Sequence, residues 1–365
     1  MPIAIAQSRQ TDPRAAAAEI AKTLAPRAGS LVVYFASASY PQEQLAAVLH
    51  KALAPARTLG CSTAGEIVSG ALSTGTVVAM HLSADDVSSV DVQLIGDIKD
   101  DRALDRALEA FGKHFGAPIR QLDPTKYVGL VLMDGMSLGE ERFLDRLGDR
   151  TDMFFVGGSA GDDLAFKQTW VHADGRVSGK GAVLAVMKPK RGFEVIKTQS
   201  FCDSGRRMVA TAVDEASRRV LEFDGRPAVE AYAAAIGATP ATLAEEFGAH
   251  PIGLMVDDEP YVRSPARIAE DGVAFFCGVK EGTELAVLDA TDIVADTKRL
   301  IAERAKGASG LLVFNCILRT LELQRRGTAD AFGKLFSSIP TVGFSTYGET
   351  YIGHLNQTAT MLLLK

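Results

Sequence analysis

Near its C-terminus the chain reads Thr341-Val-Gly-Phe-Ser-Thr-Tyr-Gly-Glu349, and near its start it reads Thr58-Leu-Gly-Cys-Ser-Thr-Ala-Gly-Glu66. The two segments lie at a constant offset of 283 residues, and an apolar run, a polar loop and a helical pattern precede each one. A looser third copy ends in Phe154-Phe-Val-Gly-Gly-Ser-Ala-Gly-Asp162. Self-similarity on this scale predicts a fold built from repeated structural units.

Each copy begins with a predicted strand that leads into a helix. The first copy predicts a strand at 30–36 and a helix at 41–54, and the looser copy predicts a strand at 128–133 and a helix at 140–147. Short strands without intervening helices are expected between residues 251 and 288. The pattern therefore predicts a mixed α/β (α+β) fold, with two related α/β halves built from strand-helix-strand units and mixed sheets in layers.

The length of 365 residues favours two domains, because a single hydrophobic core seldom grows so large. Lys188-Pro-Lys-Arg-Gly192 interrupts the apolar pattern with proline, glycine and charges, which is typical of a boundary. We therefore expect an N-terminal helical segment at 1–27, a first domain at 28–190 and a second at 191–365.

Composition limits the partners of the chain. A formal net charge of −6 argues against a nucleic-acid surface, which needs clustered Lys and Arg. No stretch is apolar for the eighteen residues or so that a membrane span requires. The four cysteines form no C-x-x-C pair, which is typical of free thiols in a reducing compartment. We expect a cytoplasmic protein that binds neither nucleic acid nor membrane.

The glycine motif predicts a binding loop at the carboxyl end of a strand, because it combines flexible backbone, hydroxyls and a carboxylate. It is neither G-x-G-x-x-G nor a P-loop, and it is one residue too long for the G-x-S-x-G nucleophile elbow. The alternative is a tight turn that buries small residues where repeats pack. In the C-terminal copy, aromatic and ionisable side chains crowd the loop: Phe344, Tyr347, Glu349, Tyr351 and His354.

Over residues 28 to 365 the sequence resembles the FIST family of sensory proteins. The segments that carry the resemblance are Phe35-Ala-Ser37, Gly60-Cys-Ser-Thr-Ala-Gly-Glu-Ile67, Gly157-Gly-Ser-Ala-Gly-Asp-Asp163, Tyr261-Val-Arg263, Cys316-Ile-Leu-Arg319, Gly343-Phe-Ser-Thr-Tyr-Gly-Glu349 and His354-Leu-Asn-Gln-Thr358. The resemblance implies a non-catalytic module that binds a small ligand, such as an amino acid, and signals to a partner such as a histidine kinase.

One branch of this family, the NosP-type haemoproteins that sense nitric oxide, shares the segments around Cys316, Tyr347 and His354. The chain differs from that branch at Thr320, Thr350 and Ala359. Similarity to the branch implies a bound haem b. The chain lacks C-x-x-C-H, so attachment would be non-covalent. His354 is the expected iron ligand and His250 the second choice.

The expected ligand-binding residues surround the C-terminal motif. Arg263 and Arg319 suit a carboxylate, since the guanidinium fork binds one in bidentate fashion. They would hold a haem propionate or, in the alternative of a sensor without haem, a polar metabolite. A further alternative is a hydrolase in which Cys316, His354 and Glu349 act as nucleophile, base and orienting group. The full expected set is Cys316, Arg319, Arg263, Ser345, Thr346, Tyr347, Glu349, His354 and Asn356.

Overall fold

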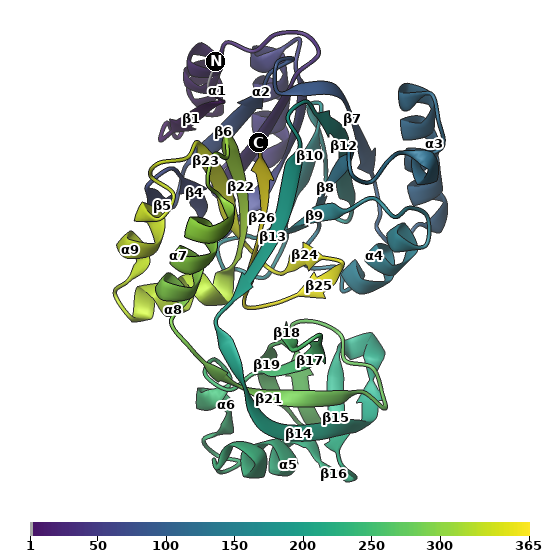
Figure 1. Cartoon of the computed structure of the whole chain (residues 1–365), viewed down its shortest axis with the longest axis vertical. Coiled ribbons are helices and arrows are strands. Elements are labelled where there is room, and N and C mark those ends of the chain that lie inside the picture. Colours follow the sequence, from purple (N-terminus) through teal and green to yellow (C-terminus); the bar gives the residue numbers. More distant parts are fainter. Residues whose placement is uncertain (1–2) are drawn as a thin grey trace.

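Three copies of one structural unit form the upper part of the protein in the computed structural model, which describes residues 3–365 (Figure 1). The first unit consists of β2 (Leu31–Ser37), α2 (Gln42–Leu53), β3 (Arg57–Thr63), the hairpin β4 (Glu66–Val68) and β5 (Ala71–Ser73), and β6 (Val77–Leu82). The second consists of β8 (Val128–Met133), α4 (Glu140–Gly148), β9 (Phe155–Ser159), the hairpin β10 (Val171–Ala173) and β11 (Arg176–Ser178), and β12 (Ala182–Pro189). The third consists of β22 (Gly310–Cys316), α8 (Ile317–Arg325), α9 (Ala329–Lys334), β23 (Thr341–Thr346), the hairpin β24 (Glu349–Tyr351) and β25 (Gly353–Leu355), and β26 (Thr358–Leu364).

The units exchange their hairpins in a closed cycle. Each unit forms a sheet around its parallel strand pair, and the hairpin of another unit completes that sheet. The hairpin β4–β5 joins the third unit, β24–β25 joins the second, and β10–β11 joins the first. Each sheet has one further strand at its edge: β1 (Ala4–Ser8), β7 (Val87–Ile95) or β13 (Phe193–Gln199). The three sheet orders are β1-β6-β2-β3-β10-β11, β7-β12-β8-β9-β24-β25 and β13-β26-β22-β23-β4-β5. The exchange makes the three units one body, which we call the repeat body.

The outer strands and remaining helices of the repeat body flank these units. They are β1 (Ala4–Ser8), α1 (Pro13–Leu24), β7 (Val87–Ile95), α3 (Asp101–Phe115), the short 3₁₀ turn η1 (Ile119–Gln121), β13 (Phe193–Gln199) and α7 (Ile293–Arg304). The side chain of Asp12 caps α1 by accepting a hydrogen bond from the backbone of Ala15 at 2.9 Å. The segment 1–27 thus contains a strand, β1, as well as the expected helix.

A shared core explains why the units fold together. Phe35 of the first unit contacts Phe314 and Phe344 of the third, with ring centroids 6.0 and 4.7 Å apart. All three rings are at most 1% exposed.

Each parallel strand pair also needs the first glycine of its motif. A Cβ on Gly343, for example, would overlap the carbonyl oxygen of Val313 on the neighbouring strand.

A second body, residues 201–290, is inserted between β13 and α7 and lies below the repeat body in Figure 1. The chain enters it at Ser200 and leaves it at Thr291, whose backbone N–H donates to the Ser200 carbonyl at 2.8 Å. We call this body the inserted domain. It contains β14 (Phe201–Asp214), η2 (Glu215–Ser217), β15 (Arg219–Phe223), β16 (Arg226–Pro227), α5 (Ala228–Ile236), α6 (Leu243–Glu246), β17 (Ile252–Val256), β18 (Glu259–Arg263), β19 (Pro265–Ala269), β20 (Gly272–Phe275) and β21 (Glu284–Ala290).

The mixed α/β class with mixed sheets is confirmed. The domain division 28–190 and 191–365 stays a prediction. Strands from both sides of residue 190 share one sheet, because β4 pairs with β23 and β13 with β26. Among the residues from Ile3 to Lys365, no helix has both the length and the apolar character needed to cross a membrane.

Candidate functional site

A largely apolar cavity of about 520 Å³ lies where the inserted domain meets the repeat body. Its floor is formed by the carboxyl ends of β8, β22 and β23, which is where ligands bind in sheets with parallel strands. Phe275 and Phe276 of the inserted domain cover it from the other side. The remaining apolar wall includes Met136, Leu138, Ile317, Leu318 and Leu321.

Three exposed apolar side chains on strained backbone mark this cavity. Leu138, Leu164 and Phe166 are 53%, 39% and 49% exposed, although large apolar side chains are usually buried. All three also have positive φ angles, of 51°, 65° and 50°. Bulky residues seldom adopt this conformation, which costs on the order of 1–2 kcal/mol each. Strain together with exposed apolar surface is typical of a binding site.

Asp162 and Tyr347 hold the strained loop in place. The Asp162 carboxylate accepts hydrogen bonds from three backbone N–H groups, those of Phe166, Lys167 and Gln168, at 2.6–3.0 Å. The Tyr347 hydroxyl donates to Asp162 at 2.5 Å and accepts from the backbone N–H of Leu164 at 2.8 Å. Burial and the neighbouring carboxylate raise the pKa of Tyr347, so the hydroxyl stays protonated.

The ring of Tyr347 also forms part of the cavity wall. It stacks on Phe166 with centroids 5.0 Å apart and an angle of 21° between the ring planes. The loop that follows the acidic end of the second-unit motif and the aromatic residue of the third-unit motif therefore build one wall together.

The polar part of the cavity consists of an ion pair and an amide. Arg218 of the inserted domain donates to Glu140 at 2.7 Å and to Glu141 at 2.6 Å. Although burial disfavours its charge, these two carboxylates raise the pKa of Arg218. Asn356 is 1% exposed and lines the cavity, and its side-chain Oδ1 has no hydrogen-bond partner among residues 3–365. A buried carbonyl oxygen without a partner lowers the stability of the fold.

A second, polar cavity of about 570 Å³ lies on the other side of Arg218. His354 and Arg263 line it together with several charged side chains, and Arg263 donates to the backbone oxygen of His354 at 3.3 Å. Burial lowers the pKa of His354, although Glu141 and Glu140 oppose the shift, so the ring is neutral.

The two motif glutamates are internal supports of the fold. Glu349 is fully buried and accepts hydrogen bonds from the Thr346 hydroxyl and from the backbone and hydroxyl of Thr358. Glu66 makes the same contacts with Thr63 and Thr76. Burial raises the pKa of both carboxyl groups to about 7. The two glutamates therefore fit the alternative interpretation of the motif, a tight turn where repeats pack, and they do not form a binding loop.

Ser345 and Arg319 also lie in the interior. The Ser345 hydroxyl pairs with Thr320 at 2.8 Å. Arg319 is 2% exposed and donates to neutral oxygens of Asn315, Ser200 and Thr297 at 2.9–3.2 Å. Burial lowers the pKa of this guanidinium to about 10, while Glu349 opposes the shift. Because the chain enters the inserted domain at Ser200, the hydrogen bond from Arg319 stabilises the connection between the two bodies. Arg319 does not line the apolar cavity.

Cys316 lines the apolar cavity but is 1% exposed. Burial, reinforced by the Glu349 carboxylate, raises the pKa of its thiol well above the usual range. Neither ring nitrogen of His354 has a hydrogen-bond partner within residues 3–365, so this imidazole does not take the proton of Cys316. The thiol, imidazole and carboxylate thus lack the contacts that a nucleophile, base and orienting group make.

His354 does not fit the role of a haem ligand. Both ring nitrogens are buried, and the ring packs against Gly348, where a Cβ would overlap it. A histidine that holds haem iron must present a ring nitrogen to the haem, whereas the ring nitrogens of His354 are buried in the wall of the polar cavity. Among the described residues, no histidine lines the apolar cavity. Within residues 3–365 there is no group of three or more His, Cys, Asp or Glu side chains that could hold a metal ion.

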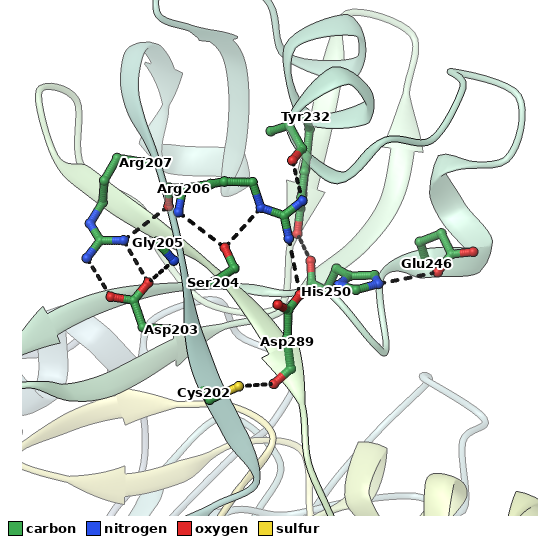
Figure 2. Close-up of polar contacts among 11 residues, drawn as sticks. Cys202, Asp203, Ser204, Gly205, Arg206, Arg207, Tyr232, Glu246, His250 and Asp289 are labelled. Carbon is green, nitrogen blue, oxygen red and sulfur yellow. Dashed lines mark hydrogen bonds and ion pairs between the residues drawn. The ribbon is translucent and has the colours of Figure 1, made fainter.

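His250 lies in a polar cluster of the inserted domain, away from both cavities (Figure 2). Its Nδ1 is 2.9 Å from Asp289 Oδ1, which also accepts from Arg206 at 3.1 Å. Tyr232 donates to the backbone oxygen of His250. These contacts tie α5 and the segment before β17 to β21, which is a structural role.

The structure brings Cys316, Tyr347 and Asn356 of the expected set together at the apolar cavity. It places Arg263 and His354 at the polar cavity, and Ser345, Thr346, Glu349 and Arg319 in the interior. Sequence reasoning missed Leu164, Phe166 and Arg218. A signal existed for the first two, because apolar residues directly follow the acidic end of the second-unit motif. No local pattern distinguished Arg218.

Comparison with known proteins agrees with the family resemblance that the sequence motifs indicate. A family model described as the FIST N domain matches residues 30–226, and one described as the FIST C domain matches residues 228–351. An uncharacterised protein of Methanocaldococcus jannaschii is 25% identical over 227 residues, which are 56% of this chain and 44% of that protein. The chain thus spans less than half the length of this relative.

Proposed function

Because the chain belongs to the FIST family, whose domains are associated with sensory signalling and are in general non-catalytic, we propose that it is a ligand sensor. The ligand binds in the apolar cavity and changes how the inserted domain sits on the repeat body. A partner protein reads this change. A histidine kinase is the partner class that the family resemblance implies.

The observation that carries the proposal is that two bodies share one cavity wall. Phe275, Phe276 and Arg218 come from the inserted domain, and the strained loop at 164–166 comes from the repeat body. A ligand between two bodies contacts both, and it stabilises the arrangement that fits it better. Relief of the backbone strain in the cavity wall would also contribute favourable free energy to ligand binding.

Haem is not part of the proposal, since the placement of His354 does not fit iron ligation. A hydrolase is not part of it either, since Cys316 has a protonated thiol and His354 makes no hydrogen bond to it.

Thermal melting of the purified full chain tests the proposal with haemin, the twenty amino acids and the neutral dye N-phenyl-1-naphthylamine as probes. A ligand at 100 times its Kd adds about 2.7 kcal/mol of stability. We expect at least one probe to raise the melting temperature of the wild type and not of Leu321→Glu, which places a charge in the cavity wall.

Ile268→Glu is the matched control. Ile268 is 36% exposed and Leu321 is 37% exposed, but Ile268 lies on β19, outside the cavity. This variant should respond as the wild type does. The proposal is wrong if no probe shifts the wild type, or if every probe that does also shifts Leu321→Glu equally.

A further inference from the structure

The inserted domain has a hydrophobic core of its own. Every residue of its two buried apolar clusters lies between positions 201 and 288, and the rings of Phe223 and Tyr232 belong to the larger cluster. Within the described residues, the apolar clusters of the repeat body contain no member of this range. Two such bodies are expected to move relative to each other, because no large hydrophobic interface joins them.

The direct contacts between the two bodies are polar. Ser264 of the inserted domain donates to Gln357 at 2.6 Å, and Gln357 donates to the backbone oxygen of Gly248 at 3.1 Å. Lys197 of the repeat body pairs with Glu259 at 2.9 Å. The apolar and polar cavities, of about 520 and 570 Å³, lie between the same two bodies. The interface therefore lacks the continuous packing that would fix a single orientation.

The chain crosses between the two bodies at one place. Only Ser200 separates β13 from β14, and Thr291 and Asp292 separate β21 from α7 (Figure 1). The backbone hydrogen bond from Thr291 to Ser200 joins the two crossings. Arg319 anchors them to the repeat body through Ser200 and Thr297. Residues at the ends of elements often serve as hinges, because a change in their backbone angles turns a whole domain.

A second connection between the bodies lies between the two cavities. Arg218 of the inserted domain lines both cavities, is 6% exposed and donates to Glu140 and Glu141 at the start of α4. Glu141 also accepts from the backbone N–H of Gly278 at 2.7 Å. The backbone of Arg218 is left-handed, with a φ of 53°, so this residue is strained like the cavity wall beside it.

The charges of this connection are unevenly matched. Two carboxylates share one guanidinium, so the group has a surplus of negative charge. Repulsion between the carboxylates and the loss of their water offset part of the attraction to Arg218. Opening returns both carboxylates to water. Such a contact holds the bodies together but costs less to open than an evenly matched pair.

We propose that the inserted domain is a lid over the apolar cavity, with its hinge at Ser200 and Thr291. The clasp that keeps the lid closed consists of Arg218, Glu140 and Glu141. The lid opens to admit the ligand, and the ligand closes or reorients it by contacting both bodies. This proposal rests on the proposed function and names the hinge and the contact through which the inserted domain changes its position.

Alkylation of the cysteines of the full chain by iodoacetamide, followed by peptide mass spectrometry, measures lid opening. Cys316 lines the apolar cavity and Cys61 lies in the core of the repeat body, and both are at most 1% exposed. Of these two thiols, lid opening exposes Cys316 alone, whereas global unfolding exposes both. Each rate is divided by the rate of the same thiol in the unfolded chain.

In the wild type, Cys316 should react more slowly than the exposed Cys202 but at least about tenfold faster than Cys61. Arg218→Met keeps the apolar stem and removes the charge of the clasp. It should raise the ratio of the Cys316 rate to the Cys61 rate by at least about another tenfold.

Arg219→Met is the matched control. Arg219 is the next residue along the chain and pairs with Asp214 and Asp271 of its own body. This variant should keep the wild-type ratio. Equal rates for Cys316 and Cys61 in the wild type would overturn the inference without any variant, because only global unfolding would then expose the cavity. A ratio that Arg218→Met leaves unchanged would overturn it as well.

The outcomes separate the lid from the proposed function. If a probe stabilises the wild type but not Leu321→Glu, and the thiol ratio does not respond to Arg218→Met, the sensor site stands and the lid is wrong. If the ratio responds but no probe stabilises the wild type, the lid opens over a cavity that is not a sensor site, and the proposed function is wrong.

Discussion

Replacing Glu349 by glutamine tests whether the carboxylate that ends the motif is a buried support. The side chain is fully buried and accepts hydrogen bonds from Thr346 and Thr358. Burial raises the pKa of its carboxyl group from 4.5 to about 7, although these hydrogen bonds oppose the shift. A glutamine at this position would keep the size and the acceptor oxygen but would not titrate.

The magnitude follows from proton linkage. Between pH 4.5 and about 7 the folded wild type binds more protons at Glu349 than the unfolded chain does. Its free energy of unfolding therefore falls as pH rises, by at most about 1.4 kcal/mol per pH unit. Across the whole window the loss relative to Glu349→Gln is roughly 3 kcal/mol, and above about pH 8 the difference is constant.

Urea denaturation at about pH 5, 6, 7 and 8 measures this difference. The fluorescence of the single tryptophan, Trp170, reports the repeat body, because its backbone N–H donates to Ser62 in the first unit. Titrating groups common to both proteins cancel when wild type and variant are subtracted. A difference that stays flat, or a wild type that gains stability relative to the variant as pH rises from about 5 to 7, would refute the reasoning.

Glu66→Gln is the internal comparison, because Glu66 has the same contacts and a pKa that burial also raises to about 7. It should show a slope of the same sign and similar size. The two substitutions should add in the double variant if the sites are independent.

Three further substitutions or measurements test other parts of the structure. Gly343→Ala should lower the free energy of unfolding by about 1–3 kcal/mol, because its Cβ would overlap Val313, whereas Gly353→Ala should cost less, since its Cβ would meet open space among the described residues. In the folded protein only the thiol of Cys202 should react rapidly with Ellman's reagent, because the other three cysteines are buried. All four thiols should react after unfolding, and more than one rapidly reacting thiol in the folded protein would contradict the burial. Asn356→Leu should raise the free energy of unfolding of the ligand-free protein by about 1 kcal/mol, because it removes an unpaired buried oxygen, and a lower value in urea denaturation would contradict this.

Much of the fold could be predicted because its pattern is local. The apolar runs at Leu31–Ser37 and Val128–Met133 are strands, and the helical pattern at 41–54 is α2 (Gln42–Leu53). Glycine at positions 60, 157 and 343 marked three equivalent strand pairs, since only a residue without Cβ fits there.

The hairpin exchange could not be predicted, because pairing between distant strands leaves no trace in local periodicity. Glu66–Val68 and Glu349–Tyr351 are short strands that follow the same sequence motif. Each of them nevertheless completes the sheet of a different unit. The same holds for the site. Arg218 reaches Glu140 across 78 residues of sequence, and only the folded chain brings them together.

The candidate site arises where the repeats stop being alike. At the position where the first motif has Ala64, the third has Tyr347, whose hydroxyl and ring hold the strained loop of the second unit. The residues that the copies share, such as Glu66 and Glu349, face inward and support the sheets. Substitutions in the shared residues should therefore change stability first, whereas Tyr347→Phe should release the loop and change ligand binding first. Since Phe keeps the stacked ring, any loss of affinity in that variant reports the hydrogen bonds to Asp162 and Leu164 alone.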